Sequence, residues 1–162
     1  MNVFQHERRV RPTGSHLSVR DITDDVAEAV QDSGIEDGIA CVYSTHTTCW
    51  VRVNEWESGL LEDYAVLLSR LVPNGGEQYS AHDDREQRTR ALGDEGREAA
   101  NGHAHCISLL LGSAGESIPV RAGELCLGTW QRILFLELDR EREELDRERE
   151  RRWIVQVFGR QL

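Results

Sequence analysis

The sequence predicts a single-domain α+β protein in which strands outnumber helices. Its 162 residues are close to the usual size of one domain and too few for two separate cores. Hydrophobic residues make up 39% of the chain, which is enough for one packed core, and charged residues make up 30%. The predicted elements mix hairpin-like strand pairs with a few helices and show no regular alternation of strand and helix. This order favours an α+β fold over a doubly wound sheet.

The first half of the chain divides into short strands and two helices. Strands are predicted where β-branched, aromatic and cysteine residues gather, and helices where apolar residues recur every three or four positions. Thr23 is the predicted N-cap of the first helix, and Gly34 is its predicted C-terminal stop. The predicted strands are 3–11, 16–20, 38–44 and 48–54, and the predicted helices are 21–34 and 57–71.

The second half contains one short buried helix, more strands and two charged segments. The helix is predicted at 101–112, and the strands are predicted at 117–120, 124–130, 132–139 and 153–159. The segments at about 83–100 and 139–151 are rich in charged residues and poor in large apolar ones, so we interpret them as solvated insertions. The strands that flank the second insertion are predicted to pair as a long hairpin. Its tip is expected to be a mobile projection remote from the functional site.

The balance of charges argues against several classes of function. The formal net charge of −10 makes nucleic acid a poor default partner, because phosphate binding needs a basic face. All 19 basic residues are arginine, which excludes mechanisms that need a lysine, such as a P-loop or a Schiff base. No apolar run is long enough to span a membrane, and the N-terminus lacks the apolar stretch of a signal peptide. A cytoplasmic protein without membrane contact is therefore expected.

The cysteines give no sign of a structural metal site or a disulfide. Cys41, Cys49, Cys106 and Cys126 form no CxxC pair, so a zinc ribbon or a thioredoxin-type dithiol is not supported. In a cytoplasmic chain these thiols are predicted to be reduced and buried.

Four of the six histidines fall in three short polar segments, 44–48, 79–84 and 101–105. Three neutral imidazoles with one open position are a well-tested arrangement for a catalytic divalent metal. Acidic residues such as Asp83 or Glu55 could orient such ligands or act as bases. Scattered histidines are also common as hydrogen-bonded surface or core residues, so spacing alone leaves both interpretations open.

A further polar interruption occurs at 128–131, within the strand-like C-terminal region. Its glycine, tryptophan and glutamine could provide close backbone approach, a stacking face and an amide group. A β-bulge with a core tryptophan is the structural alternative.

Taken in order, these segments resemble one known family. The stretch HTTCWVRVNE at 46–55 is followed by Asp63 on a helix, by Tyr79 with His82 and Asp83, and by NGHAHCISLLLG at 101–112. IPV, GELCLGTWQRILFLE and RRWIVQVFG complete the pattern. Over roughly residues 37–160, this order and content resemble the YjbQ-like family of small conserved proteins.

The resemblance implies an α+β fold with a β-sandwich core and flanking helices, assembled as a homotrimer. It implies that His46, His82 and His105 gather in one pocket, where a divalent metal such as zinc would bind. His103 is expected to face elsewhere or to sit at the rim. Glu55 and Asp63 would be the catalytic acids, and Glu137 also matches a motif position. The residues implied to bind substrate are Thr47, Asn54, Ser108, Thr129, Trp130 and Gln131.

The activity attached to the family is a weak, secondary thiamine-phosphate synthase, which implies a small phosphorylated ligand. Two departures bear on it: Trp56 replaces a small amide, and Ile107 stands where the family often has a lysine. Histidine is also a soft ligand for diphosphate-bound magnesium. The alternatives are therefore a metal-dependent hydrolase of another small metabolite and a non-catalytic metal- or ligand-binding trimer.

Overall fold

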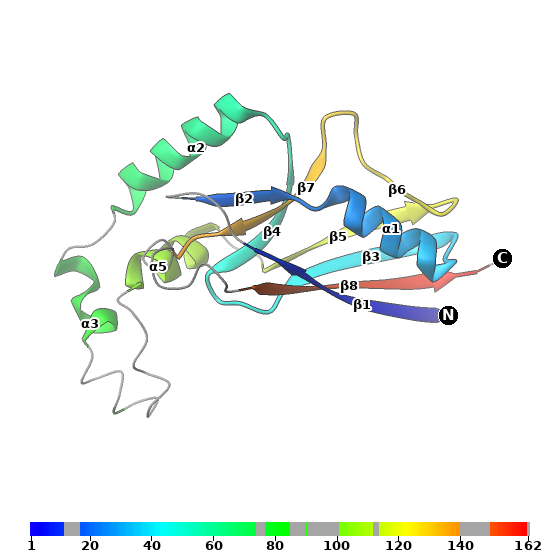
Figure 1. The fold of residues 1–162 in the computed structure, drawn as a ribbon, viewed down its shortest axis with the longest axis horizontal. Coiled ribbons are helices and arrows are strands. Elements are labelled where there is room, and N and C mark those ends of the chain that lie inside the picture. Colours follow the sequence, from blue (N-terminus) through cyan, green and yellow to red (C-terminus); the bar gives the residue numbers. More distant parts are fainter. Residues whose placement is uncertain are drawn as a thin grey trace.

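The strands of this chain form two antiparallel sheets whose side chains alternate between a buried and a more exposed face. The computed structural model describes residues 1–11, 17–73, 77–84, 90, 101–111, 114–139 and 150–161. The larger sheet has the order β1 (Asn2–Val10), β8 (Arg151–Arg160), β3 (Asp37–Ser44), β5 (Gly115–Arg121) and β6 (Glu124–Leu125). The smaller sheet has the order β2 (Ser18–Asp21), β7 (Arg132–Glu137) and β4 (Cys49–Asn54). The predicted α+β fold with a two-sheet core is confirmed (Figure 1).

The main core lies between the two sheets and is closed by helix α1 (Thr23–Ser33). Trp153 of β8 and Phe135 of β7 are its largest buried side chains, and Val26 and Val30 of α1 pack against the same cluster. Gly34 ends α1 in the left-handed conformation with φ 63°, as its position predicted. Thr23 is the first helical residue rather than the N-cap.

The oxygen that stabilises the start of α1 comes from Asp21. Its Oδ1 accepts hydrogen bonds from the Thr23 backbone N at 2.9 Å and the Thr23 hydroxyl at 2.6 Å. Burial alone would raise the pKa of Asp21, but these bonds and Arg132 lower it. Thr23 does not act as the predicted N-cap, because the side chain of Asp21, two positions earlier, supplies the hydrogen-bond acceptor at the start of the helix.

A second core covers the outer face of the smaller sheet. Helix α2 (Ser58–Leu71), the 3-10 turn η1 (Glu77–Tyr79), helix α3 (Ser80–Asp83) and helix α5 (Gly102–Leu111) all lie on this side (Figure 1). Trp50, Leu134 and Leu136 from the sheet meet Leu68 and Ile107 from the helices. The predicted apolar stripe of α2 is only partly used, because Leu68 is its sole buried residue among those described.

The predicted hairpin between the last two strands is wrong. Strand β7 belongs to the smaller sheet, between β2 and β4, and β8 lies between β1 and β3 in the larger sheet. The ends of the intervening segment are also not solvated, since Asp139 and Arg151 are both buried. Residues 140–149, the predicted mobile tip, lie outside the described residues.

One other predicted strand is shorter than expected, and one predicted insertion lies mostly outside the described residues. The segment 124–130 forms a strand only over Glu124–Leu125 and continues as a loop. Most of the predicted insertion at 83–100 lies outside the described residues. None of the described helices is long and apolar enough to cross a membrane.

Candidate functional site

The clearest polar constellation is a pair of histidines held at the start of α5. The rings of His82 on α3 and His105 on α5 have centroids 4.8 Å apart. Asp83 Oδ1 lies 2.9 Å from Nδ1 of His82 and accepts a hydrogen bond of 3.0 Å from the backbone N of Gly102. One carboxylate therefore orients a histidine and also stabilises the N-terminus of the helix that carries the second histidine.

The glycine at position 102 is required by this close packing. A Cβ there would lie 2.9 Å from Cβ of Tyr79 and 3.0 Å from Oδ1 of Asp83. Burial alone would raise the pKa of Asp83, but the hydrogen bonds from His82 and Gly102 outweigh it and lower the pKa. Asp83 is therefore ionised at neutral pH, and Nδ1 of His82 must carry the proton that it donates.

His103 belongs to the packing beneath this pair rather than to the pair itself. Its side chain is buried, and its ring centroid lies 6.3 Å from that of Tyr79. Sequence reasoning had placed it facing elsewhere or at a rim.

His46 lies in the connection between β3 and β4, in a different environment. Its Nε2 accepts a hydrogen bond of 3.2 Å from the backbone N of Arg152. Burial, followed by the positive charge of Arg151, lowers the pKa of His46, so the ring is neutral at neutral pH. Among the described residues, no three His, Cys, Asp or Glu side chains gather closely enough to hold one metal ion. The single chain thus brings two of the three predicted ligands together, and the three-histidine site stays a prediction.

A buried ionic network connects the His46 loop to the start of α5. Glu137 accepts hydrogen bonds from Nε of Arg151, from the Thr48 hydroxyl at 2.9 Å and from the Cys49 thiol at 3.1 Å. Backbone N–H groups of Leu138 and Asp139 also donate to it, at 3.0 and 2.9 Å. This carboxylate is fully occupied by donors, so its geometry is that of a structural anchor.

The partners of Glu137 respond to its charge. Burial would lower the pKa of Arg151, but the Glu137 carboxylate outweighs it and raises the pKa. Burial, and then the same negative charge, raises the pKa of the Cys49 thiol. Cys49 is therefore a neutral thiol and not a nucleophile.

The network extends to α5 through Asp139. Its Oδ2 accepts a hydrogen bond of 3.0 Å from Nδ2 of Asn101, the residue that precedes α5. Sequence reasoning missed Asn101, Asp139 and Arg151 as buried polar partners. For Asp139 and Arg151 a signal was present, because each directly adjoins an apolar strand in the sequence. The charged residues around them made this signal hard to see.

Other predicted site residues lie at the opposite end of the smaller sheet. Cys49 of β4 pairs with Glu137 of β7, whereas Asn54 at the far end of β4 pairs with Arg132. Five residues of antiparallel strand span about 17 Å. The Asn54 end and the Glu137 end are therefore too far apart within one chain to form a single small pocket.

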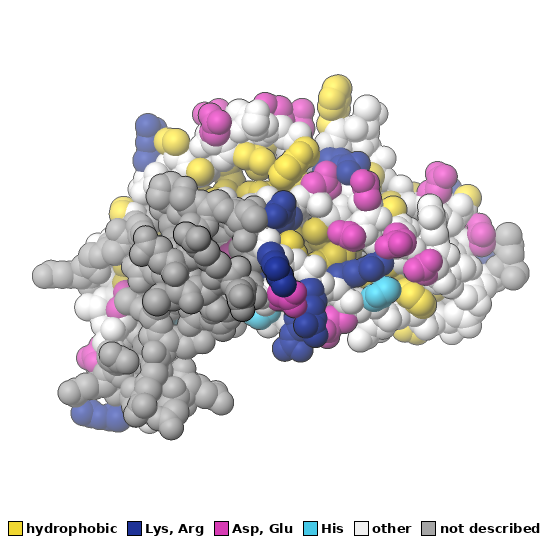
Figure 2. Space-filling model, in the orientation of Figure 1, with side chains coloured by type: hydrophobic (Ala, Val, Ile, Leu, Met, Phe, Trp, Pro, Cys, Tyr) yellow, Lys and Arg dark blue, Asp and Glu magenta, His cyan; other side chains and the backbone are white. Residues whose placement is uncertain are grey.

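A small cavity of about 160 Å³ marks the Asn54 end. Asn54 and Glu55 line it together with Arg52, Tyr64 and leucines of α2 and β7. Figure 2 shows hydrophobic side chains gathered beside α2. Burial raises the pKa of Tyr64, so its hydroxyl stays protonated.

The remaining predicted residues occupy separate positions. Trp130, in the loop before β7, is 73% exposed and so is not a core tryptophan, and Gln131 accepts a hydrogen bond of 2.8 Å from the backbone N of Gly128. Asp63 and Thr47 are exposed, and Ser108 is half-buried on α5 one turn after His105.

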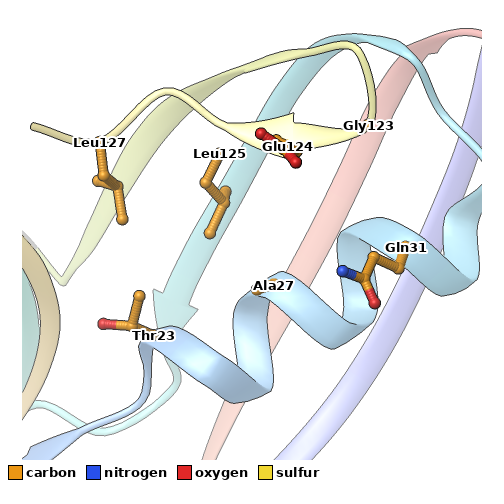
Figure 3. Close-up of a pocket in the computed structure, with 7 residues that line it drawn as sticks. All are labelled: Thr23, Ala27, Gln31, Gly123, Glu124, Leu125 and Leu127. Atoms are coloured by element: carbon orange, nitrogen blue, oxygen red, sulfur yellow. The ribbon is translucent and has the colours of Figure 1, made fainter.

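A larger cavity of about 290 Å³ lies between α1 and the segment that follows β5. Figure 3 shows Thr23, Ala27 and Gln31 along one side of α1, facing Leu125 and Leu127 across the gap. None of the residues that were predicted for the site lines it, and Glu124 is the one ionisable side chain among its described lining residues. The described residues that line this cavity therefore do not form a group of catalytic side chains.

Comparison with known proteins agrees with the architecture. The model of the family described as UPF0047 protein YjbQ-like matches residues 7–160. A UPF0047 protein from Archaeoglobus fulgidus is 41% identical over 127 residues, which cover 78% of this chain and 86% of the relative. One from Methanothermobacter thermautotrophicus is 34% identical over 140 residues, covering 86% and 85%.

Solved structures show the same fold. A YbjQ-like protein of unknown function from Sulfolobus solfataricus has a TM-score of 0.75 and 29% identity, covering 98% of this chain and 99% of its own. A hypothetical protein from Aeropyrum pernix has a TM-score of 0.74 and 33% identity, covering 97% and 99%. The chain therefore belongs to the YjbQ-like UPF0047 family, whose function is uncharacterised.

Proposed function

We propose that this protein is a metal-assisted enzyme acting on a small phosphorylated metabolite, with His82 and His105 as its metal-binding pair. The observation that supports this most directly is the arrangement of Asp83, His82 and His105. Because Nδ1 of His82 keeps its proton and donates a hydrogen bond to Asp83, Nε2 of the neutral ring carries a lone pair. A carboxylate bound to the second nitrogen of a histidine is the usual support of a metal ligand.

The two rings fit a shared ion such as zinc. Imidazoles that bind one zinc at about 2.0–2.1 Å in tetrahedral geometry have ring centres about 5 Å apart, and the 4.8 Å separation of these two rings is close to that. A bound divalent metal would supply a Lewis acid for a phosphoryl oxygen. His82 and His105 would hold it, and Asp83 would keep His82 in the required tautomer.

We include a homotrimer in the proposal, because the candidate residues of one chain lie at two ends of a sheet. A cyclic trimer joins two different surfaces of the subunit. Such contacts could complete a site to which His46 and the Asn54 end also contribute.

The specific reaction that we propose is thiamine-phosphate synthesis. It joins a pyrimidine diphosphate to a thiazole phosphate and releases pyrophosphate. Glu55 is better placed than Asp63 to move a proton, because Glu55 lines a cavity and Asp63 is exposed. Asn54, Ser108 and the 129–131 loop would contact the substrate. With no lysine in the chain, exposed arginines such as Arg152 beside His46 would bind phosphate.

A hydrolase of another small metabolite is the second candidate, and the donor set favours it. The paired ligands are neutral nitrogen donors, which suit zinc better than magnesium. The described residues also contain no group of three acidic side chains for a diphosphate-bound magnesium.

Metal analysis tests the common part of both candidates. We expect about one zinc per chain in the wild type after reconstitution, and loss of it in His82→Ala and His105→Ala. His6→Ala is the matched control, because His6 lies on β1 and packs edge to face on Phe4. Equal metal content in all four proteins, or none in the wild type, would contradict the metal site.

Incubation with metabolites then separates the candidates. Thiamine phosphate formed from the two phosphorylated precursors supports the synthase, and release of phosphate or another fragment from a single metabolite supports the hydrolase. A ligand that is retained with no product after prolonged incubation supports a non-catalytic binding trimer and rejects both enzymes.

A further inference from the structure

The cavity between α1 and the segment after β5 differs in character from one end to the other. Figure 3 shows Thr23 and Leu127 toward one end, and Gln31 and Glu124 toward the other. Leu125 lies between them, and both leucines are partly buried against the main core. The cavity therefore has an apolar interior and a polar end.

The polar groups along the cavity differ in whether they are already engaged. The Thr23 hydroxyl donates to Oδ1 of Asp21 at 2.6 Å and accepts from the backbone N of Ile133 at 2.7 Å. Within the part of the chain that the structure describes, neither the Gln31 amide nor the Glu124 carboxylate has a hydrogen bond or an ion pair. These two side chains at the polar end are therefore available to a ligand.

The surroundings of the polar end are negatively charged. A Cβ added at Gly123 would lie 3.9 Å from both carboxylate oxygens of Glu36, so a second carboxylate stands beside the turn that precedes Glu124. Gln31 belongs to the last turn of α1, which contains no basic residue, and the C-terminal end of a helix carries a partial negative charge. Both features favour a cation at this place.

The basic residue opposite Glu124 in the strand register is Arg121, and no ion pair joins these two described side chains. The charge of Arg121 acts instead on Asp37, whose pKa is lowered by the hydrogen bond from Arg160 and further by Arg121. The polar end therefore keeps its negative charge, in a chain whose net charge is already −10.

We propose that this cavity binds a small organic amine. The apolar body of the amine would lie between Ala27 and the two leucines, and its protonated amino group would donate to the Glu124 carboxylate and the Gln31 amide oxygen. This combination follows the general design of ligand pockets, in which apolar walls provide contact area and a few polar groups fix the orientation. An anionic ligand would meet like charges at the polar end, and a bare metal ion would leave the apolar walls unused.

The size of the cavity suits a ligand of one ring or a short chain. Its volume of about 290 Å³ lies at the lower limit of ordinary ligand pockets, which measure about 300–1,000 Å³. One wall is held by the tight turn between β5 and β6, where Ala122 and Gly123 have φ values of 51° and 74°. A wall that is already ordered costs little to fix on binding. No described lining residue belongs to the proposed metal site, so this proposal is independent of that chemistry.

Phenethylamine, which combines one ring with a protonated amine, is the probe. It is titrated into the wild-type protein while the amide NMR signals of the chain are followed. Saturable shifts of the signals of Ala27, Gly123 and Leu125 are expected, with a Kd on the order of 1 mM, as a ligand of this size allows. Phenethyl alcohol and phenylpropionate carry the same ring and chain with a neutral or a negative end, and both should bind at least about threefold more weakly.

Two substitutions locate the amine in the cavity. Ala27→Leu fills the apolar interior and is expected to remove the saturable shifts, whereas Glu124→Gln keeps the shape and should weaken amine binding about threefold without affecting the alcohol. Asp25→Asn is the matched control, because Asp25 is exposed two residues before Ala27, on almost the opposite side of α1, and its loss should leave the Kd of the amine unchanged. Circular dichroism establishes that each variant is folded, and if Ala27→Leu does not fold, the comparison of Glu124→Gln with Asp25→Asn decides.

The outcomes distinguish this site from weaker explanations. Absence of saturable shifts at the cavity in the wild type would overturn the proposal. Equal weakening by Glu124→Gln and Asp25→Asn would overturn it too, since the amine would then respond only to the net charge of the chain. Alcohol binding as tight as amine binding would reveal an apolar pocket that does not recognise charge, and would reject the amine.

Discussion

Replacing Glu137 by glutamine should destabilise the fold strongly. Glu137 and Arg151 are each 4% exposed, and the carboxylate is surrounded by donors. A glutamine amide would point a donor at the Arg151 guanidinium or the Cys49 thiol, and the buried positive charge would lose its partner. Breaking one side of a buried ion pair costs about 3–5 kcal/mol. Because domains are typically stable by about 5–15 kcal/mol, a loss of this size would move the unfolding midpoint clearly.

The assay is urea unfolding followed by circular dichroism at one fixed protein concentration, since self-association would otherwise shift the midpoint. Glu28→Gln is the control, because it breaks the exposed Arg8–Glu28 pair and should cost about 0–1 kcal/mol. The double variant Glu137→Leu with Arg151→Met should recover only the part of the loss that comes from the unpaired Arg151 charge. It removes both charges, but it leaves the Thr48 hydroxyl and the backbone N–H groups of Leu138 and Asp139 without their acceptor. A loss in Glu137→Gln within about 1 kcal/mol of the Glu28→Gln control would refute the reasoning.

Three further changes have outcomes set by the structure. Asp83→Asn should lower the free energy of unfolding at pH values above the ordinary aspartate pKa of about 3.9. The difference in unfolding free energy between variant and wild type should vanish as pH falls through the lowered pKa of Asp83, and urea unfolding at several pH values would check this. Leu68→Ala, in the core under α2, should cost about 2–5 kcal/mol, whereas Val66→Ala on the exposed side should cost under about 1 kcal/mol, and equal losses would contradict the packing of α2. Because the pKa of His46 is lowered, the stability that its neutral ring contributes is present above about pH 6.5 and is lost as pH falls. His46→Gln should flatten the dependence of the unfolding free energy on pH in this range, and an unchanged slope of that free energy against pH would contradict the prediction.

Residue composition located most strands but could not choose their partners. It correctly indicated strands at 38–44 and 153–159, because β-branched, aromatic and cysteine residues gather there. It could not show that β7 and β8 join different sheets, since either pairing would bury the same apolar faces. The buried Glu137–Arg151 pair joins the end of β7 to the start of β8, where the chain passes from one sheet to the other.

The site was predictable to a similar extent. The polar segments around His82 and His105 were identified from composition and family resemblance, and the chain does bring those two rings together. The separation of Asn54 from the histidines follows from strand length and register, which a list of motif residues does not contain. The helix-capping role of Asp83 depends on the packing of α3 against α5, and that contact joins residues 19 positions apart.

The sheet order also determines when this protein can fold during its synthesis. Strand β8, which ends at Arg160, is the link between β1 and the rest of the larger sheet. Strand β1 is synthesised well before β8 and has no other partner in the described fold until β8 leaves the ribosome. Contacts between the two ends of a chain form slowly, because loop closure must precede them. Between the synthesis of β1 and that of β8, the nascent chain therefore carries a strand that lacks its partner, and a product that is cut short before residue 151 cannot complete the larger sheet.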